Sequence, residues 1–131
     1  MLKKTIKYTD YNGEQREEDF YFNLTKPEII ELEVGDGGSL TDYINNIVRS
    51  KDAKEVFGIF KKLIAKSYGI KSPDGRRFIK SEEVSKAFFE TEAYVELYME
   101  LLEDPVKAAE FVKQILPPDM RGETIHVANN N

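Results

Sequence analysis

The chain has 131 residues, one His, no Cys and a formal net charge of −5. This length fits one domain with a single apolar core, and the lack of Cys excludes disulfide scaffolds, thiolate zinc sites and Cys nucleophiles. The single His126 excludes a His-rich metal site and nearly all His-based catalysis, so no metal or cofactor is expected.

The first 24 residues predict a β-hairpin. A β-prone run ends at Tyr8, and residues 10–13 (Asp-Tyr-Asn-Gly) supply turn chemistry, because Asn-Gly accepts positive φ angles. In the return run, Phe20, Phe22 and Leu24 alternate and should share one face. An isolated hairpin is marginally stable in water, so this one is expected to pack on helices or to pair with another element.

Residues 25–118 predict about six short helices. The first spans Pro27–Val34 and begins with a capping box formed by Thr25 and Glu28. The others are expected to begin or end at recognisable caps and breakers: a second from Ser39, a third from Asp52 to Gly69, then helices capped by Ser81, Thr91 and Asp104, with Pro117-Pro118 ending the last. Residues 71–77 predict a turn, built around Pro73-Asp74-Gly75.

These elements predict a mainly α fold, in which an N-terminal β-hairpin (1–24) precedes a compact helical bundle (25–118). Residues 1–118 are expected to form a single domain, and residues 119–131 a flexible tail. No run approaches the roughly 20 apolar residues that span a bilayer. No apolar segment follows the basic start of the chain, so no signal peptide is predicted and a location inside the cell is expected.

Charge is distributed unevenly along the chain. Residues 61–80 contain seven Lys and Arg against one acid, a net charge of +6, whereas residues 81–111 contain nine acids against two Lys, a net charge of −7. Opposite patches of this kind can steer partners or let copies stack head to tail. The simpler interpretation, which the sequence favours, is that each patch is a solvated face with internal pairs.

Catalytic and nucleic-acid-binding functions have little support. Glu92, Glu96 and Glu100 share one helix face, but di-metal bundles also need His from facing helices. No Ser has a credible His partner, so an enzyme is not predicted. The basic segment 61–80 could contact nucleic acid, yet the acidic pI of about 5.0 argues against it. An interaction module, which uses exposed helix faces or a strand edge, is the remaining class.

Three segments resemble the tail assembly chaperones of long-tailed phages and prophages of Gram-positive bacteria. These are residues 59–69 (IFKKLIAKSYG), residues 71–81 (KSPDGRRFIKS) and residues 91–94 (TEAY) before an acidic helix. The opening hairpin followed by residues 22–31 (FNLTKPEIIE) is also similar, and the likeness covers about residues 3–117.

The resemblance implies a non-enzymatic chaperone that coats and solubilises the tape measure protein and helps to recruit tail tube subunits. It also implies action in the host cytoplasm and absence from the mature virion. From the charge pattern we add a hypothesis of self-association, in which basic side chains of one copy face acidic ones of the next copy or of the partner. The residues concerned are Arg76, Arg77, Lys80, Glu92, Glu96 and Glu100.

Two other functions stay open from the residues. The first is a small helical adaptor or inhibitor that binds one host protein, through the hairpin edge for example. The second is a nucleic-acid-binding accessory factor that uses residues 61–80, a function that a salt-sensitive gel shift would have to support.

Overall fold

The computed structural model describes residues 1–36 and 53–118. Two strands begin the chain, β1 (Leu2–Thr9) and β2 (Gln15–Phe22), and helix α1 (Lys26–Asp36) follows. Helix α3 (Ala53–Ser67) leads into strands β3 (Tyr68–Lys71) and β4 (Phe78–Ile79). Three helices complete the described chain: α4 (Glu82–Phe89), α5 (Glu92–Glu103) and α6 (Pro105–Ile115).

The predicted N-terminal hairpin is confirmed. Strands β1 and β2 pair antiparallel along their whole length, from Leu2 opposite Phe22 to Thr9 opposite Gln15. Gly13 has a φ of 82° in the connecting turn, a conformation that glycine adopts without steric cost. Phe22 and Leu24 are fully buried and Phe20 packs beside them, as the alternation of apolar residues predicts.

The predicted mainly α fold with about six helices is wrong. Residues 68–71, where we expected a helix to end at Gly69 and a turn to begin at Lys71, form strand β3, and residues 78–79 form strand β4. The four strands make one antiparallel sheet in the order β1-β2-β3-β4, so the described residues form a mixed α/β fold with five helices. Three predictions lie outside the described residues: the helix from Ser39, the cap of the third helix at Asp52, and the tail from residue 119.

Helix α3 ends at Ser67 rather than at Gly69, because the carbonyl of Ser67 accepts a hydrogen bond from the chain just after β2. The Asn23 N–H donates to Ser67 O at 2.8 Å, and the buried Ser67 hydroxyl bonds back to Leu63 O at 2.6 Å. From Tyr68 the chain therefore runs extended beside β2. A Cβ on Gly69 would lie 2.6 Å from the Phe78 ring, so this glycine permits close packing of β3 on β4.

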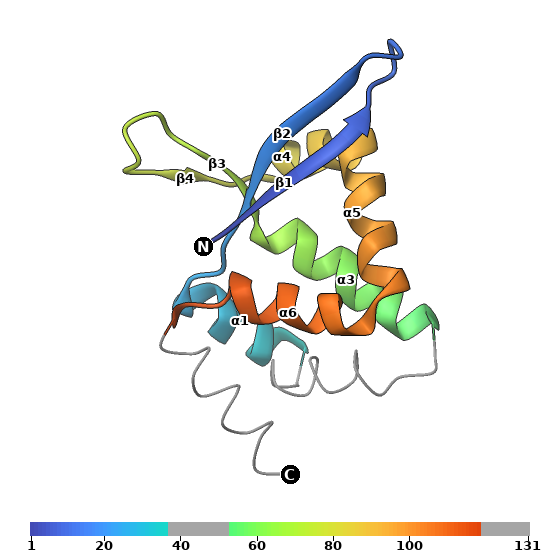
Figure 1. The fold of residues 1–131 in the computed structure, drawn as a ribbon. Coiled ribbons are helices and arrows are strands. Elements are labelled where there is room, and N and C mark those ends of the chain that lie inside the picture. Colours follow the sequence, from blue (N-terminus) through green and yellow to red (C-terminus); the bar gives the residue numbers. More distant parts are fainter. Residues whose placement is uncertain (37–52, 119–131) are drawn as a thin grey trace.

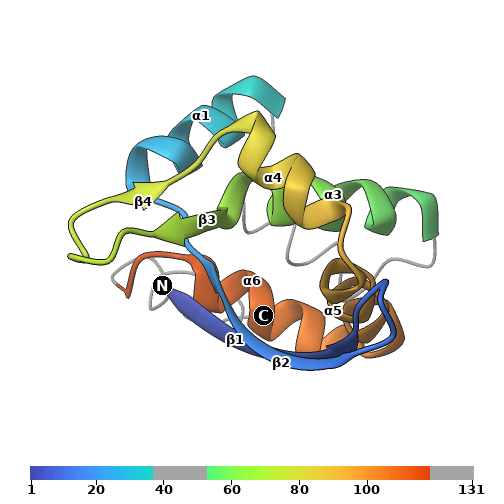
Figure 2. The same cartoon turned by 90° about the horizontal axis from the view of Figure 1, so that it is seen from above.

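The sheet forks, and the helices fill one side of the fork. Strand β3 pairs with β2 only at Tyr21–Gly69 and Phe22–Tyr68, after which the β1–β2 and β3–β4 hairpins diverge (Figure 1). Seen from above, α1, α3 and α4 lie to one side of the hairpins' meeting point and α6 lies beside β1 (Figure 2). One apolar core joins β1, β2, β3 and the described helices, and within it the fully buried Phe22 contacts the rings of Tyr68, Phe88 and Phe111.

Candidate interaction surface

The six predicted site residues lie on two opposite parts of the molecule. Arg76 and Arg77 are in the turn between β3 and β4, and Lys80 follows β4; Glu92, Glu96 and Glu100 are on α5. In both views the β3–β4 turn projects from one side and α5 lies at the other (Figures 1 and 2). The fold therefore keeps the basic and acidic groups of one chain apart.

Side-chain hydrogen bonds define the β3–β4 turn. Asp74 accepts bonds from the Ser72 hydroxyl at 2.7 Å and from the Arg76 N–H at 3.1 Å, and these bonds lower the pKa of the Asp74 carboxyl. The Arg77 N–H donates to the Ser72 hydroxyl at 3.0 Å, and Gly75 has a φ of 75°. The bonded turn presents Arg76 and Arg77 to solvent, and among the described residues neither guanidinium forms an ion pair.

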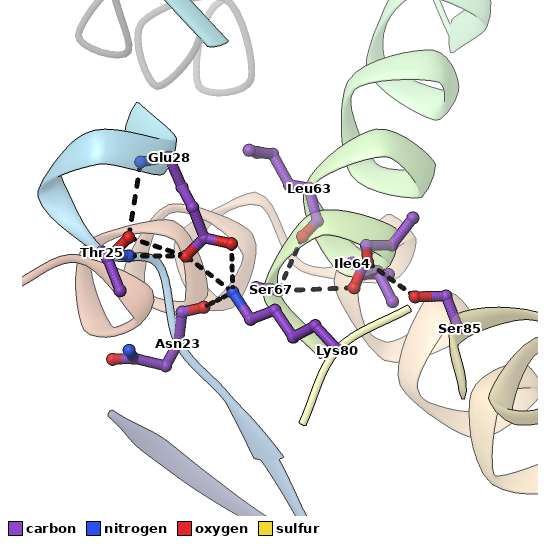
Figure 3. A network of polar contacts seen from close by, with 9 residues as sticks. Asn23, Thr25, Glu28, Leu63, Ile64, Ser67, Lys80 and Ser85 are labelled. Carbon is purple, nitrogen blue, oxygen red and sulfur yellow. Dashed lines mark hydrogen bonds and ion pairs between the residues drawn. The ribbon is translucent and has the colours of Figure 1, made fainter. Parts of the chain in front are cut away.

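Lys80, in contrast, is occupied within its own chain. Its ammonium donates to both Glu28 oxygens at 2.8 Å and to the Asn23 carbonyl at 2.6 Å, which ties the end of β4 to the start of α1 (Figure 3). Glu28 also forms the predicted capping box: the Thr25 N–H donates to its carboxylate at 2.9 Å. Lys80 therefore stabilises the fold where the β3–β4 hairpin joins it.

Burial and hydrogen bonding shift the pKa of Glu28 in opposite directions. Burial raises the pKa, but the Lys80 ammonium and the Thr25 hydrogen bonds together outweigh that cause, so the pKa of Glu28 lies below its ordinary value of 4.5. The carboxylate is therefore ionised, and paired with Lys80, at neutral pH.

The three α5 carboxylates differ in their surroundings. Glu100 pairs with Lys4 of β1 at 3.0 Å and with Lys107 of α6 at 3.6 Å. Glu92 lies beside Tyr11 in the β1–β2 turn, where partial loss of hydration and then the Glu92 charge raise the pKa of the Tyr11 hydroxyl. Glu96 is exposed and forms no ion pair within residues 1–36 and 53–118.

An apolar patch on α5 and α3 escaped the sequence analysis. Val95 and Met99 are 43% and 45% exposed and lie one turn apart on α5, next to Tyr98 on the same surface. The Tyr98 ring contacts Phe57 of α3, itself 40% exposed, with ring centroids 6.2 Å apart. We call Phe57, Val95, Tyr98 and Met99 the α5 patch. Its sequence signal was the apolar pair Val95 and Met99, which are four residues apart on the helix that follows Thr91.

Two clefts lined by described residues border these surfaces. One, of about 510 Å³, separates the outer part of the β1–β2 hairpin from α5. The other, of about 470 Å³, lies between α1, α3 and α4, and its lining residues are mostly polar and charged, with Ala65 and Phe89 as the apolar residues. Within the described part of the chain, no three His, Cys, Asp or Glu side chains are arranged to hold a metal ion. Across the same residues, no helix has the length and apolarity to cross a membrane.

The exposed apolar patch, the clefts and the separated charges are surfaces that suit contact with other macromolecules. A family described as phage tail assembly chaperone matches residues 1–129, and the chain belongs to this family. No curated protein and no solved structure gives a significant match. The predicted membership of the tail assembly chaperones is thereby confirmed, while the Gram-positive, long-tailed origin stays a prediction.

Proposed function

We propose that this chaperone binds and solubilises the tape measure protein in the host cytoplasm, helps to recruit tail tube subunits, has no enzymatic activity and is absent from the mature virion. The family match across residues 1–129 carries this proposal. It is more specific than the role of the family, which is assembly of the phage tail.

Among the surfaces of the described residues, the α5 patch suits this task best. A long amphipathic helix presents an apolar stripe, and a helix of the chaperone with exposed aliphatic and aromatic side chains can cover it. Met99 adds an unbranched, adaptable side chain of the kind that promiscuous binding surfaces use. Weak contacts repeated along a long partner hold it by avidity, and each contact remains displaceable when the tube polymerises.

Charging the patch tests this proposal. The double variant Val95→Lys, Met99→Lys should copurify at least about tenfold less tape measure protein than the wild-type chain. Each substitution removes an apolar contact, and the new ammonium group would lose its water when the partner covers the patch. The tagged chain and the tape measure protein are co-expressed. The copurified tape measure protein is then quantified on gels that contain equal amounts of the tagged chain.

The matched control places the same two charges elsewhere. Ile30 of α1 and Val106 of α6 are 59% and 67% exposed and lie outside the patch, so Ile30→Lys, Val106→Lys should copurify the partner like wild type. Equal recovery with both double variants would show that the α5 patch is not the binding surface. No recovery even with the wild-type chain would exclude tape measure binding itself.

A stoichiometric adaptor or inhibitor of one host protein remains the second candidate. It differs in one observable, since such a protein would bind its target in a fixed complex and would not raise the solubility of a long helical tail protein. Measuring how much of the co-expressed tape measure protein is in the soluble fraction therefore separates the two functions.

A further inference from the structure

The β3–β4 turn carries two arginines whose charge the described chain leaves unmatched. Arg76 and Arg77 are exposed at the tip of a projecting hairpin, and the Asp74 carboxylate, the acid in this turn, is occupied by Ser72 and the Arg76 N–H. Guanidinium groups form strong, planar hydrogen bonds with carboxylates. This turn is therefore shaped and charged to meet an acidic surface.

The cleft between the β1–β2 hairpin and α5 has the complementary property. Its two cations already have partners: Lys7 pairs with Glu17 at 3.4 Å, and Arg16 pairs with Asp10 at 2.6 Å. Glu96, on the α5 wall, is the lining carboxylate that forms no ion pair with any described residue. Glu92 lies one turn away on the same helix, so the unmatched charge along this wall is negative.

One chain cannot join these two surfaces to each other. The β3–β4 turn and the α5 side of the molecule face opposite directions in both views (Figures 1 and 2). A second copy of the chain carries the same pair of surfaces and can present its cleft to the turn of the first. An interface between two different patches leaves one of each patch free at the ends, so it can extend into an open chain.

We propose that this protein self-associates head to tail, with Arg76 and Arg77 of one copy in the cleft beside Glu92 and Glu96 of the next. Lys80 and Glu100 take no part in the contact, because each is already paired within its own chain. The proposal concerns the isolated chain, so it stands or falls separately from tape measure binding.

A charge-swap experiment tests the contact. The wild-type chain should show a sedimentation coefficient that rises with concentration and falls back to the monomer value near 1 M salt, where screening extends only about 3 Å. Two double variants are compared. One carries Arg76→Glu and Arg77→Glu in the turn, and the other carries Glu92→Lys and Glu96→Lys in the cleft. Each should remain monomeric on its own, because like charges then face each other across the contact. An equimolar mixture of the two should associate again, since every reversed turn meets a reversed cleft.

The control reverses two exposed lysines away from both surfaces, Lys61 on α3 and Lys86 on α4, and should associate like wild type. Thermal melts confirm that each variant folds. A wild-type chain that is monomeric throughout the concentration series, a reversed variant that associates normally, or a mixture that stays monomeric would each overturn the proposal. The proposal requires that the wild-type chain and the mixture associate and that neither double variant associates by itself.

Discussion

Replacing Phe22 with Ala should lower the free energy of unfolding by about 3–5 kcal/mol, the usual cost of removing a buried aromatic ring. Phe22 is fully buried at the end of β2, and its ring lies 5.4–5.8 Å from those of Tyr68, Phe88 and Phe111. Those rings come from β3, α4 and α6. The substitution therefore opens a cavity where the sheet meets two helices, and aromatic edge contacts are lost as well.

Urea unfolding followed by circular dichroism measures this effect, with Phe57→Ala as the matched control. Phe57 is 40% exposed and contacts one described ring, so its loss should cost roughly 1 kcal/mol or less. If both Phe variants lost the same small amount of stability, Phe22 would not be the fully buried core residue that the fold describes.

Replacing Lys80 with Met should lower the free energy of unfolding by about 1.5–3 kcal/mol, the range for hydrogen bonds to charged groups. Methionine keeps the aliphatic stem but leaves the partly buried Glu28 carboxylate without its cation and the Asn23 carbonyl without a donor. The control Lys61→Met removes an exposed lysine of α3 and should change stability by less than about 0.5 kcal/mol.

The pH dependence of this loss has a defined sign. The pKa of Glu28 is lowered in the folded chain, so its contribution to stability is present above its ordinary value of 4.5 and is lost as the pH falls through the folded value. The gap between wild type and Lys80→Met should therefore shrink below about pH 4.5. A gap that is constant from pH 7 to about pH 3 would mean that Lys80 acts through packing and not through Glu28.

Local signals in the sequence located most helix starts correctly. Ser81, Thr91 and Asp104 each cap a helix through a side-chain oxygen that accepts a backbone N–H, as their residue types predict. Caps are formed within four residues, so a single sequence contains the information they need. The alternation of Phe20, Phe22 and Leu24 was readable for the same reason.

Strands β3 and β4 were missed because their stability comes from distant partners. Tyr68–Lys71 follows a helical pattern directly and contains Gly69, which reads as a helix stop. What makes it a strand is the edge of β2, more than 40 residues earlier, together with the stacking of Tyr68 on Phe88 at 4.3 Å. Pairing between segments so far apart leaves no periodicity in a strand of two to four residues.

The charged residues show the same limit. Sequence placed Arg76 and Lys80 in one basic group, but the fold exposes the first and buries much of the second against Glu28. It likewise separates Glu96, which is unpaired among the described residues, from Glu100, which Lys4 and Lys107 hold. Net charge along the chain predicted two opposite regions, while the three-dimensional partners decide which charges remain available.

The solubility of the tape measure protein tests the proposed function most directly. Expressed alone, the long helical tail protein should partition mainly into the insoluble fraction, and co-expression with this chain should move most of it into the supernatant, because its apolar stripe is then covered. The Val95→Lys, Met99→Lys chain should fail to do so. A soluble fraction that is the same with the wild-type chain, with this variant and with no chaperone would contradict the proposed function.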